Sequence, residues 1–255
     1  MRTPPDVALN VPEETLPGYP GMVIREADGK RVLESMVWGF PLRLKGMKPD
    51  SKPRPVNNIA DLSKPMWSGL ARKPQGRCLI PLTGFAEPAG RKGSKTRTWV
   101  TVKGQPIFAW GGLWRESAEG GPVYSGAMAD CNEAIRPLHD RMPVLLHPHE
   151  YEQWLRGSFE DLLAFQKRCF FPDDLIEIQP TSELWVNKEG SGLQRGPIIA
   201  LTSVDQPPWS ATRLRPRRPL PLPGLPRASR LAQSMVPPGG VRRFSVTLPA
   251  PAVPT

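Results

Sequence analysis

The chain has 255 residues, of which 39% are hydrophobic and 33 are prolines, and its formal net charge is +10. This length allows one large domain or two small ones. No stretch approaches the roughly 20 apolar residues of a membrane-spanning helix, and the N-terminal segment MRTPPDVALNVPEE has no apolar run, so we expect neither a transmembrane helix nor a signal peptide.

The N-terminal half is predicted to be rich in β-strands. Residues 22–40 indicate a hairpin, because two β-prone runs flank Asp28-Gly29, a favoured tight-turn pair. A short helix is predicted over residues 62–72, beginning at Pro65. Three more strands, separated by glycine or proline, are predicted over residues 97–102, 105–114 and 122–129.

The next part of the chain is predicted to end the sheet and to add helices. Residues 141–146 form an apolar strand candidate, and Pro143 bars a helix from running through it. Two helices are then predicted, over residues 147–157 and 158–170. The second begins with Ser158 and an acidic residue three positions later, which is capping-box spacing.

This order of elements predicts an α+β fold: a single β-rich, mostly antiparallel domain over residues 1–190, with a few helices. Residues 191–255 are predicted to be a disordered tail, because a segment this rich in proline and charge cannot bury enough apolar surface to offset the entropy of ordering. A reading-frame error is an alternative origin for the tail.

The positive charge is concentrated in this tail. Residues 206–255 contain 12 prolines, 8 arginines and no acidic residue. Removing that +8 from the total of +10 leaves about +2 for residues 1–205. The basic composition is therefore weak evidence that the folded part binds nucleic acid.

The cysteines indicate a reducing environment. Cys78, Cys131 and Cys169 have no paired spacing, and an odd number without an export signal is typical of reduced thiols in the cytoplasm. Cys78 and Cys131 are flanked by apolar residues and are expected to be buried.

Three polar residues stand in otherwise structural stretches: Asn58 in PVNNIADL, Glu87 in GRCLIPLTGFAEP and His139 in AIRPLHDRMPVLL. Each has an ordinary explanation, as a turn asparagine, a solvated carboxylate and a satisfied core histidine. Together, however, an amide, a carboxyl and an imidazole are the groups that hold and protonate an oxygen of a sugar or carbonyl.

We predict neither a metal nor a cofactor. His147 and His149 can chelate together only in an extended segment, whereas Pro148 is typical of a helix start, and no cysteine or carboxylate cluster lies near them in sequence. The stretch RKGSKTR lacks the spacing of a phosphate-binding loop.

Two basic loops, residues 43–55 and 90–97, lie next in sequence to Asn58 and Glu87. They are either solvated surface loops or sites that neutralise DNA phosphates. The candidates for phosphate contact are Arg43, Lys45, Arg54 and Lys95. Trp38 and Phe40 offer a possible face for stacking a base, although core packing is the other role open to Trp38.

The sequence resembles the SOS response-associated peptidase family, also called abasic-site processing proteins, in five ordered stretches: VWGF (37–40), VNNIAD (56–61), GRCLIPLTGFAEP (76–88), GGLW (111–114) and LHDRMPVLL (138–146). Order and spacing agree over about residues 7–186. The resemblance implies a β-rich α+β domain with a basic channel for single-stranded DNA. It also implies an N-terminal cysteine, exposed by removal of the initiator methionine, that captures the aldehyde of an abasic site as a thiazolidine.

The resemblance also implies roles for individual residues. Asn58 would orient the sugar oxygen or the N-terminal amine, Glu87 would shuttle protons during ring closure and methionine removal, and His139 would assist ring opening as an acid. Arg141 would contact a phosphate beside the lesion. The implied partner is single-stranded DNA with abasic sites, in the cytoplasm and associated with the nucleoid.

The sequence departs from the family pattern at several positions. Residue 2 is arginine rather than cysteine, and no internal cysteine has a free α-amine, so the polypeptide as written is expected not to crosslink. Ile59-Ala60 stand where the family has Ala-Arg, and Pro88 replaces an aromatic residue. Either the true start lies upstream, with a cysteine, or the chain is a degenerate relative. A non-catalytic DNA-binding relic and a truncated gene product are the alternatives to an active processing protein.

Overall fold

A computed structural model describes residues 11–43, 46–48, 50–51, 53–119, 121–168 and 171–185, and the backbone of two short strands at 198–200 and 244–245. The predicted tail, residues 191–255, lies outside the described residues except for these two strands. None of the helices in this part of the chain has both the length and the apolar character needed to span a bilayer.

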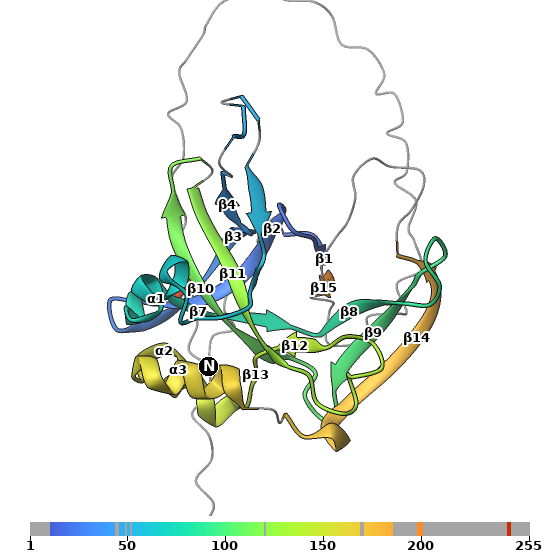
Figure 1. Cartoon of the computed structure of the whole chain (residues 1–255). Helices are drawn as coiled ribbons and strands as arrows, with labels where there is room; N and C mark the ends of the chain where they lie inside the picture. Colours follow the sequence, from blue (N-terminus) through green and yellow to red (C-terminus); the bar gives the residue numbers. More distant parts are fainter. Residues whose placement is uncertain are drawn as a thin grey trace, which may run out of the picture.

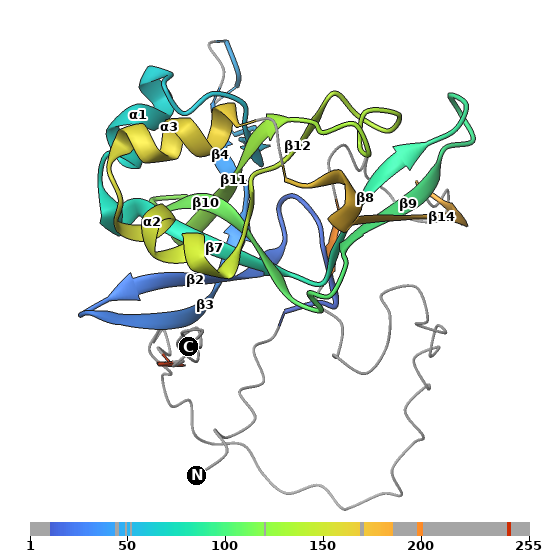
Figure 2. The same cartoon turned by 90° about the horizontal axis from the view of Figure 1, so that it is seen from below.

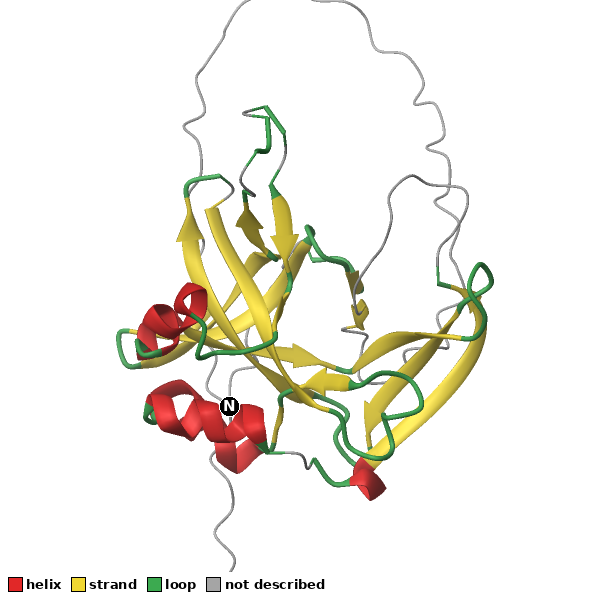
Figure 3. Ribbon diagram, viewed as in Figure 1, coloured by secondary structure: helices red, strands yellow, loops and turns green. Residues whose placement is uncertain are grey.

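Two large β-sheets and a small ribbon form the framework, and the helices pack beside the larger sheet (Figure 1, Figure 3). The larger sheet has the order β12-β11-β10-β7-β2-β3-β16. Its strands are β2 (Pro20–Ala27), β3 (Lys30–Trp38), β7 (Arg77–Leu82), β10 (Phe108–Ser117), β11 (Gly121–Asp130), β12 (Arg141–Pro143) and β16 (Phe244–Ser245). Two short strands pair with it, β6 (Asn58–Ile59) on β11 and β13 (Leu145–Leu146) on β10.

The second sheet has five strands in the order β1-β15-β8-β9-β14. They are β1 (Glu14–Thr15), β8 (Gly84–Ala89), β9 (Thr96–Val102), β14 (Ile176–Leu184) and β15 (Ile198–Ala200). β4 (Phe40–Leu42) and β5 (Arg54–Val56) form the separate ribbon. All pairings are antiparallel except those of β11 with β3 and with β6, so the predicted α+β, mostly antiparallel fold is confirmed.

The predicted N-terminal hairpin is formed by β2 and β3. Asp28 and Gly29 both have positive φ, 51° and 73°, as the tight turn between two twisted strands requires. Buried and less buried residues alternate along β2, because successive side chains of a strand point to opposite faces of the sheet.

The apolar run predicted as a strand at residues 141–146 forms β12 and β13, inserted between β10 and β11. The Val144 N–H donates to the Ala127 carbonyl oxygen (2.8 Å), and the Val144 carbonyl oxygen accepts from the Gly111 N–H (3.0 Å). Both backbone groups of Val144 are thus satisfied inside the sheet, where the apolar side chains are buried.

The three predicted helices are present, each with bounds shifted by a few residues. They are α1 (Pro65–Ala71), α2 (Tyr151–Arg156) and α3 (Phe159–Lys167), and the 3-10 turns are η1 (Pro74–Gly76), η2 (Pro148–Glu150) and η3 (Asp173–Leu175). At the start of α3, the Asp161 N–H donates to the Ser158 hydroxyl (3.1 Å) and the Ser158 N–H donates to the Asp161 carboxylate (2.7 Å). The predicted capping box is therefore confirmed.

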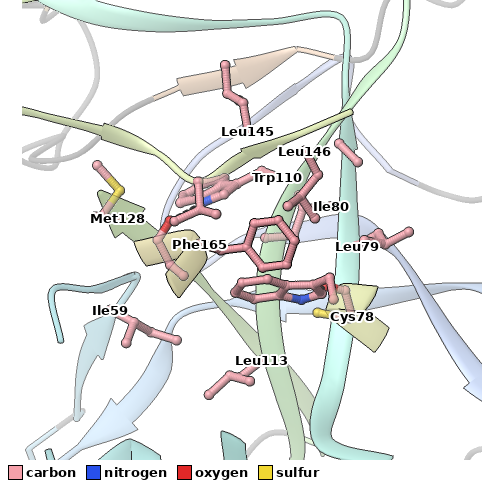
Figure 4. Close-up of a cluster of buried hydrophobic side chains, with 14 of the residues drawn as sticks. Ile59, Cys78, Leu79, Ile80, Trp110, Leu113, Met128, Leu145, Leu146 and Phe165 are labelled. Carbon is pink, nitrogen blue, oxygen red and sulfur yellow. Dashed lines mark hydrogen bonds between the residues drawn. The ribbon is translucent and has the colours of Figure 1, made fainter. Parts of the chain in front are cut away.

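The main core lies between the larger sheet and the helices α2 and α3, as Figure 4 shows for Cys78, Trp110, Leu113 and Phe165. Gly126 of β11 permits this packing, because a Cβ atom there would lie 2.0 Å from the Trp110 ring. Cys78 and Cys131 are buried free thiols, as expected, and Cys169 lies outside the described residues.

Figure 2 shows the β8–β9 hairpin and β14 projecting to one side of the larger sheet, away from the helices. The chain passes between the two sheets at Thr83, the single residue that separates β7 from β8. This crossing places Glu87 on one sheet and the elements that carry Asn58 and Arg141 on the other.

Candidate functional site

β11 brings together two of the segments that the sequence singled out. β6 pairs in parallel with β11, with Asn58 opposite Gly126. β12 pairs antiparallel with the following residues of β11, with Arg141 opposite Asp130. Asn58 and Arg141 are therefore attached to neighbouring parts of one strand, although 83 positions separate them in sequence.

The Arg141 side chain links these segments directly. Its Nη2 donates to the Ala60 carbonyl oxygen (2.8 Å) and to the Met128 carbonyl oxygen (3.0 Å), while its buried Nε has no hydrogen-bond partner. In this structure the guanidinium holds the residues that follow Asn58 against β11. Phosphate contact by the same group, which the family resemblance implies, remains a prediction.

His139 precedes this clamp and is exposed. Its Nδ1 accepts the Arg141 N–H (2.9 Å) and lies 3.0 Å from a carboxylate oxygen of Asp140. The same Nδ1 also lies 3.0 Å from the Arg141 carbonyl oxygen, which is an acceptor, so these contacts can be met by either tautomer. Because Nδ1 is engaged by all of these groups, Nε2 is the ring nitrogen left to contact a ligand.

Asn58 has an unsatisfied acceptor. Its Oδ1 is buried and has no hydrogen-bond partner, whereas the backbone around it is well held: the Asn57 carbonyl accepts both the Gly126 N–H (3.1 Å) and the Trp38 indole N–H (3.0 Å). A buried acceptor without a partner costs free energy. A hydroxyl or amine of a ligand would satisfy it.

Glu87 is buried. The ordinary interpretation of its place in the sequence, a solvated carboxylate, is therefore wrong. Its residue is 5% exposed, and burial raises the pKa of its carboxyl to about 7, against the opposing effect of the positive charge of Lys95. Across the strand pair it faces Thr98, whose buried hydroxyl has no hydrogen-bond partner. A carboxyl with such a pKa can take up or release a proton near neutral pH.

Contacts connect Asn58, Arg141 and His139, but they do not connect these residues to Glu87. Among the described residues, no hydrogen bond or ion pair joins Glu87 to Asn58 or to His139. The loop over residues 131–140, which precedes β12, runs near the β8–β9 hairpin in both views (Figure 1, Figure 2). Convergence of Glu87 with the other candidates therefore stays a prediction, supported by this arrangement of the loop.

Trp38 corrects a prediction. Its side chain is fully buried, stacked on Tyr124 at a centroid distance of 6.3 Å and edge-on to Trp110 at 5.9 Å. A DNA base cannot stack on a ring that is enclosed on all sides, so the DNA-binding role is wrong and the alternative core role holds. Phe40 is also buried, at 5% exposure.

Tyr19 is an exposed aromatic residue that the sequence analysis missed. It is 57% exposed. Its backbone is fixed to the end of β3, because its carbonyl accepts the Trp38 N–H (2.9 Å) and the preceding Gly18 donates to the Trp38 carbonyl (2.7 Å). The Gly-Tyr-Pro turn was visible in the sequence, but a turn signal does not reveal whether the ring is exposed.

The basic candidates occupy different environments. Arg43 forms an ion pair with Glu119 (2.7 Å), whereas Arg54 on β5 and Lys95 before β9 are exposed. Lys45 lies outside the described residues. Exposed cations on the ribbon and beside Glu87 are compatible with phosphate contact, which no observed contact tests.

The two histidines considered as metal ligands stack on each other at 5.4 Å, and His147 also stacks on Phe171 at 4.6 Å. Within the described ranges, no three or more histidine, cysteine or acidic side chains form a group that could hold a metal ion.

Comparison with known proteins gives one family. The family model described as SOS response associated peptidase (SRAP) matches residues 8–188. Two curated relatives come from Bacillus subtilis (strain 168). The abasic site processing protein YoaM is 38% identical over 115 residues, which is 42% of this chain and 50% of YoaM. The abasic site processing protein YoqW is 31% identical over 121 residues, 44% of this chain and 54% of YoqW. The chain thus spans about half the length of the curated relatives it matches.

Solved structures share the fold. A crystal structure of a Bordetella bronchiseptica protein matches with a TM-score of 0.56 and 24% identity, covering 67% of this chain and 88% of that protein. A Bacteroides thetaiotaomicron protein matches with a TM-score of 0.53 and 21% identity, covering 64% of this chain and 74% of that protein. At these identities the likeness concerns the fold alone.

Proposed function

The chain belongs to the SOS response associated peptidase family, and on that premise we propose that it recognises abasic sites in single-stranded DNA. The observation that carries the proposal is the buried Asn58 Oδ1 without a partner. A ring-closed abasic site carries a C1′ hydroxyl where an intact nucleotide carries a base, and ring opening frees a hydroxyl at C4′. One such hydroxyl would donate to Asn58 Oδ1 and satisfy it.

Proton transfer would be the task of Glu87 and His139. With a pKa of about 7, the Glu87 carboxyl is present in both protonation states at neutral pH, as a group that alternately donates and accepts a proton requires. His139 would act as an acid from Nε2, because Nδ1 is engaged by the Arg141 backbone and by Asp140. Both roles require the DNA to bring its sugar within hydrogen-bond reach of these atoms.

Covalent capture is a separate matter for this polypeptide. A thiazolidine forms when an α-amine adds to the aldehyde, water leaves to give an imine, and the thiol of the same residue closes the ring. Cys78, Cys131 and Cys169 are internal residues without a free α-amine. We therefore propose that none of these three cysteines forms a thiazolidine at the lesion.

A second candidate function, binding single-stranded DNA without regard to lesions, is favoured by the charge distribution. Of the net charge of +10, the arginines of residues 206–255 contribute +8. Binding through such residues would be strongly salt-dependent and would not distinguish abasic from intact strands.

Fluorescence anisotropy with two labelled oligonucleotides separates the candidates. One strand carries a single abasic site and the other is intact. Under the first proposal the wild type prefers the abasic strand, Asn58→Ala loses the preference while keeping its affinity for the intact strand, and the matched control Asn57→Ala keeps the preference. Equal affinity of the wild type for both strands would contradict the first proposal and support the second.

A denaturing gel tests the covalent step with the same abasic strand. No retarded band that depends on these three cysteines is expected. A retarded band that disappears when all three are replaced by serine would overturn this proposal.

A further inference from the structure

We infer that Gln166 of α3 is a positioning residue for Asn58. The inference rests on the proposed function only where it predicts DNA binding. Gln166 is a polar residue in a helix face that packs on the core, and it is 9% exposed. Its three hydrogen bonds with other described residues all go to backbone groups of β11 and of the segment that carries Asn58.

The contacts of Gln166 form a three-point bridge. Its Nε2 donates to the Met128 carbonyl oxygen (2.8 Å) and to the Ile59 carbonyl oxygen (3.1 Å). Its Oε1 accepts the Leu62 N–H (2.8 Å). One planar amide therefore binds β11 on one side and two residues of the 57–62 segment on the other.

The chemistry of the side chain explains why glutamine suits this place. An amide supplies two N–H donors and an acceptor from a single rigid group. An ionised glutamate has no donor for the carbonyls of Ile59 and Met128. Leucine removes the side-chain partner of the Ile59 carbonyl and of the Leu62 N–H, which is costly for buried groups, while the Met128 carbonyl keeps its hydrogen bond from Arg141.

The Asn58 segment needs such support because its own strand is short. β6 consists of only two residues, Asn58 and Ile59. On the N-terminal side the Trp38 indole holds the Asn57 carbonyl, and on the C-terminal side Arg141 holds the Ala60 carbonyl. Gln166 adds the bonds to Ile59 and Leu62, so backbone groups on both sides of Asn58 are fixed by side chains from distant elements.

Fixing the backbone fixes where Asn58 Oδ1 lies. A recognition group gains specificity when its orientation is set before the ligand arrives, and a displacement of about 1 Å can remove most of the benefit. Loss of the Gln166 bridge would let the 57–62 segment move, and the preference for the lesion would fall without loss of the general attraction to DNA.

The test uses the full-length chain with Gln166→Leu and Gln166→Glu, and Leu162→Val as the matched control. Leu162 is a fully buried residue of the same helix, so its truncation reports the effect of loosening α3 alone. In Gln166→Leu, hydrogen exchange at the Leu62 amide is expected to speed up about tenfold or more, relative to Leu162→Val, because that N–H loses its acceptor. Unchanged exchange at Leu62 would overturn the inference, whatever the protein does with DNA.

DNA binding supplies the second readout. Gln166→Leu should lower the ratio of abasic to intact affinity about threefold or more, by analogy with other positioning residues, while Leu162→Val leaves the ratio unchanged. In an Asn58→Ala background, Gln166→Leu should lower the ratio no further, since the residue acts through Asn58. An equal further loss in that background would contradict the positioning role.

Gln166→Glu gives a signature that general destabilisation does not. A carboxyl at this position can donate a hydrogen bond, to one of the two carbonyls, only when it is protonated. The preference for abasic DNA, measured relative to wild type at each pH, should therefore recover in part between about pH 8 and about pH 5. A ratio that stays flat over this range would count against the inference. If the wild type shows no preference for the lesion, only the proposed function is contradicted. Hydrogen exchange at Leu62 still decides whether Gln166 holds the 57–62 segment.

Discussion

Glu87 owes its chemical character to burial. The carboxyl lies on β8 facing Thr98, and desolvation outweighs the attraction of Lys95, which raises the pKa to about 7. No described residue forms a hydrogen bond with this carboxyl. Its ionised form is therefore poorly stabilised, and it destabilises the fold at high pH. Such a cost is typical of groups retained for function.

The first prediction concerns the pH dependence of stability. Between about pH 4.5 and about pH 7, folded Glu87 keeps a proton that the unfolded chain releases, so stability falls as pH rises across this window. The difference between the pKa of about 7 and the ordinary value of 4.5 for a glutamate corresponds to about 3 kcal/mol. Glu87→Gln should therefore be more stable than the wild type by about this amount at pH 8, with little difference at pH 4.5.

Urea unfolding of both proteins at several pH values checks this expectation. Glu160→Gln, which removes an exposed carboxylate of α3, is the control. A difference between wild type and Glu87→Gln that is the same at pH 4.5 and pH 8 would contradict the prediction.

Tyr19 leads to the second prediction. Its ring is exposed and its backbone is fixed next to Trp38, whose indole binds the Asn57 carbonyl. An exposed ring on a backbone that is fixed beside Trp38 suits stacking with a DNA base, so Tyr19→Ala should weaken binding of single-stranded DNA by about 1–3 kcal/mol, equally for abasic and intact strands.

Anisotropy titrations of Tyr19→Ala and Tyr19→Trp measure the effect, and tryptophan should preserve binding. Ile107→Ala removes a similarly exposed apolar side chain, 50% exposed, and should have no effect. Equal losses at Tyr19 and Ile107 would show that stacking is not involved.

At the scale of elements, α3 connects helix stability to the site. Its first turn is closed by the reciprocal bonds of Ser158 and Asp161, and Gln166 lies in its last turn. The helix also contributes Phe159, Leu162 and Phe165, whose side chains are buried in the core. Fraying of α3 would therefore loosen the hydrogen bonds that hold the 57–62 segment.

The third prediction follows from the cap. Ser158→Ala removes the acceptor for the Asp161 N–H and should lower the free energy of unfolding by about 1 kcal/mol. Ser158→Asn, which keeps a side-chain acceptor, should restore most of it. Denaturant midpoints measure both variants, and an alanine variant as stable as the wild type would show that solvent replaces the cap at no cost.

At the scale of the whole molecule, charge and chemistry are separated along the chain. The candidate site is built from residues 58–141, whereas most of the net positive charge belongs to residues 206–255. General attraction to DNA and recognition of a lesion should therefore be separable by deletion.

The fourth prediction is that deleting residues 206–255 reduces the salt dependence of binding. The formal net charge falls from +10 to about +2. The slope of log affinity against log salt for single strands, about −0.7 per neutralised phosphate, should become shallower. The ratio of abasic to intact affinity should stay the same. An unchanged slope would show that the phosphates are neutralised by residues 1–205.

The sequence by itself determined the local elements and the family. Asp28-Gly29 specifies the hairpin, Ser158 and Asp161 specify the start of α3, and the spacing of the family stretches is matched over residues 8–188. These signals are readable because each depends on interactions between residues close together in the chain, or on patterns shared with relatives.

Only the tertiary structure decided which side chains are enclosed and which backbone groups they bind. The sequence did not distinguish the buried Trp38 from the exposed Tyr19, nor the buried Glu87 from a solvated carboxylate. It gave no sign that Arg141 and Gln166 bind carbonyls of the Asn58 segment. Burial and hydrogen-bond partners depend on elements far apart in sequence that meet only when the sheets pack, and these long-range contacts build the site.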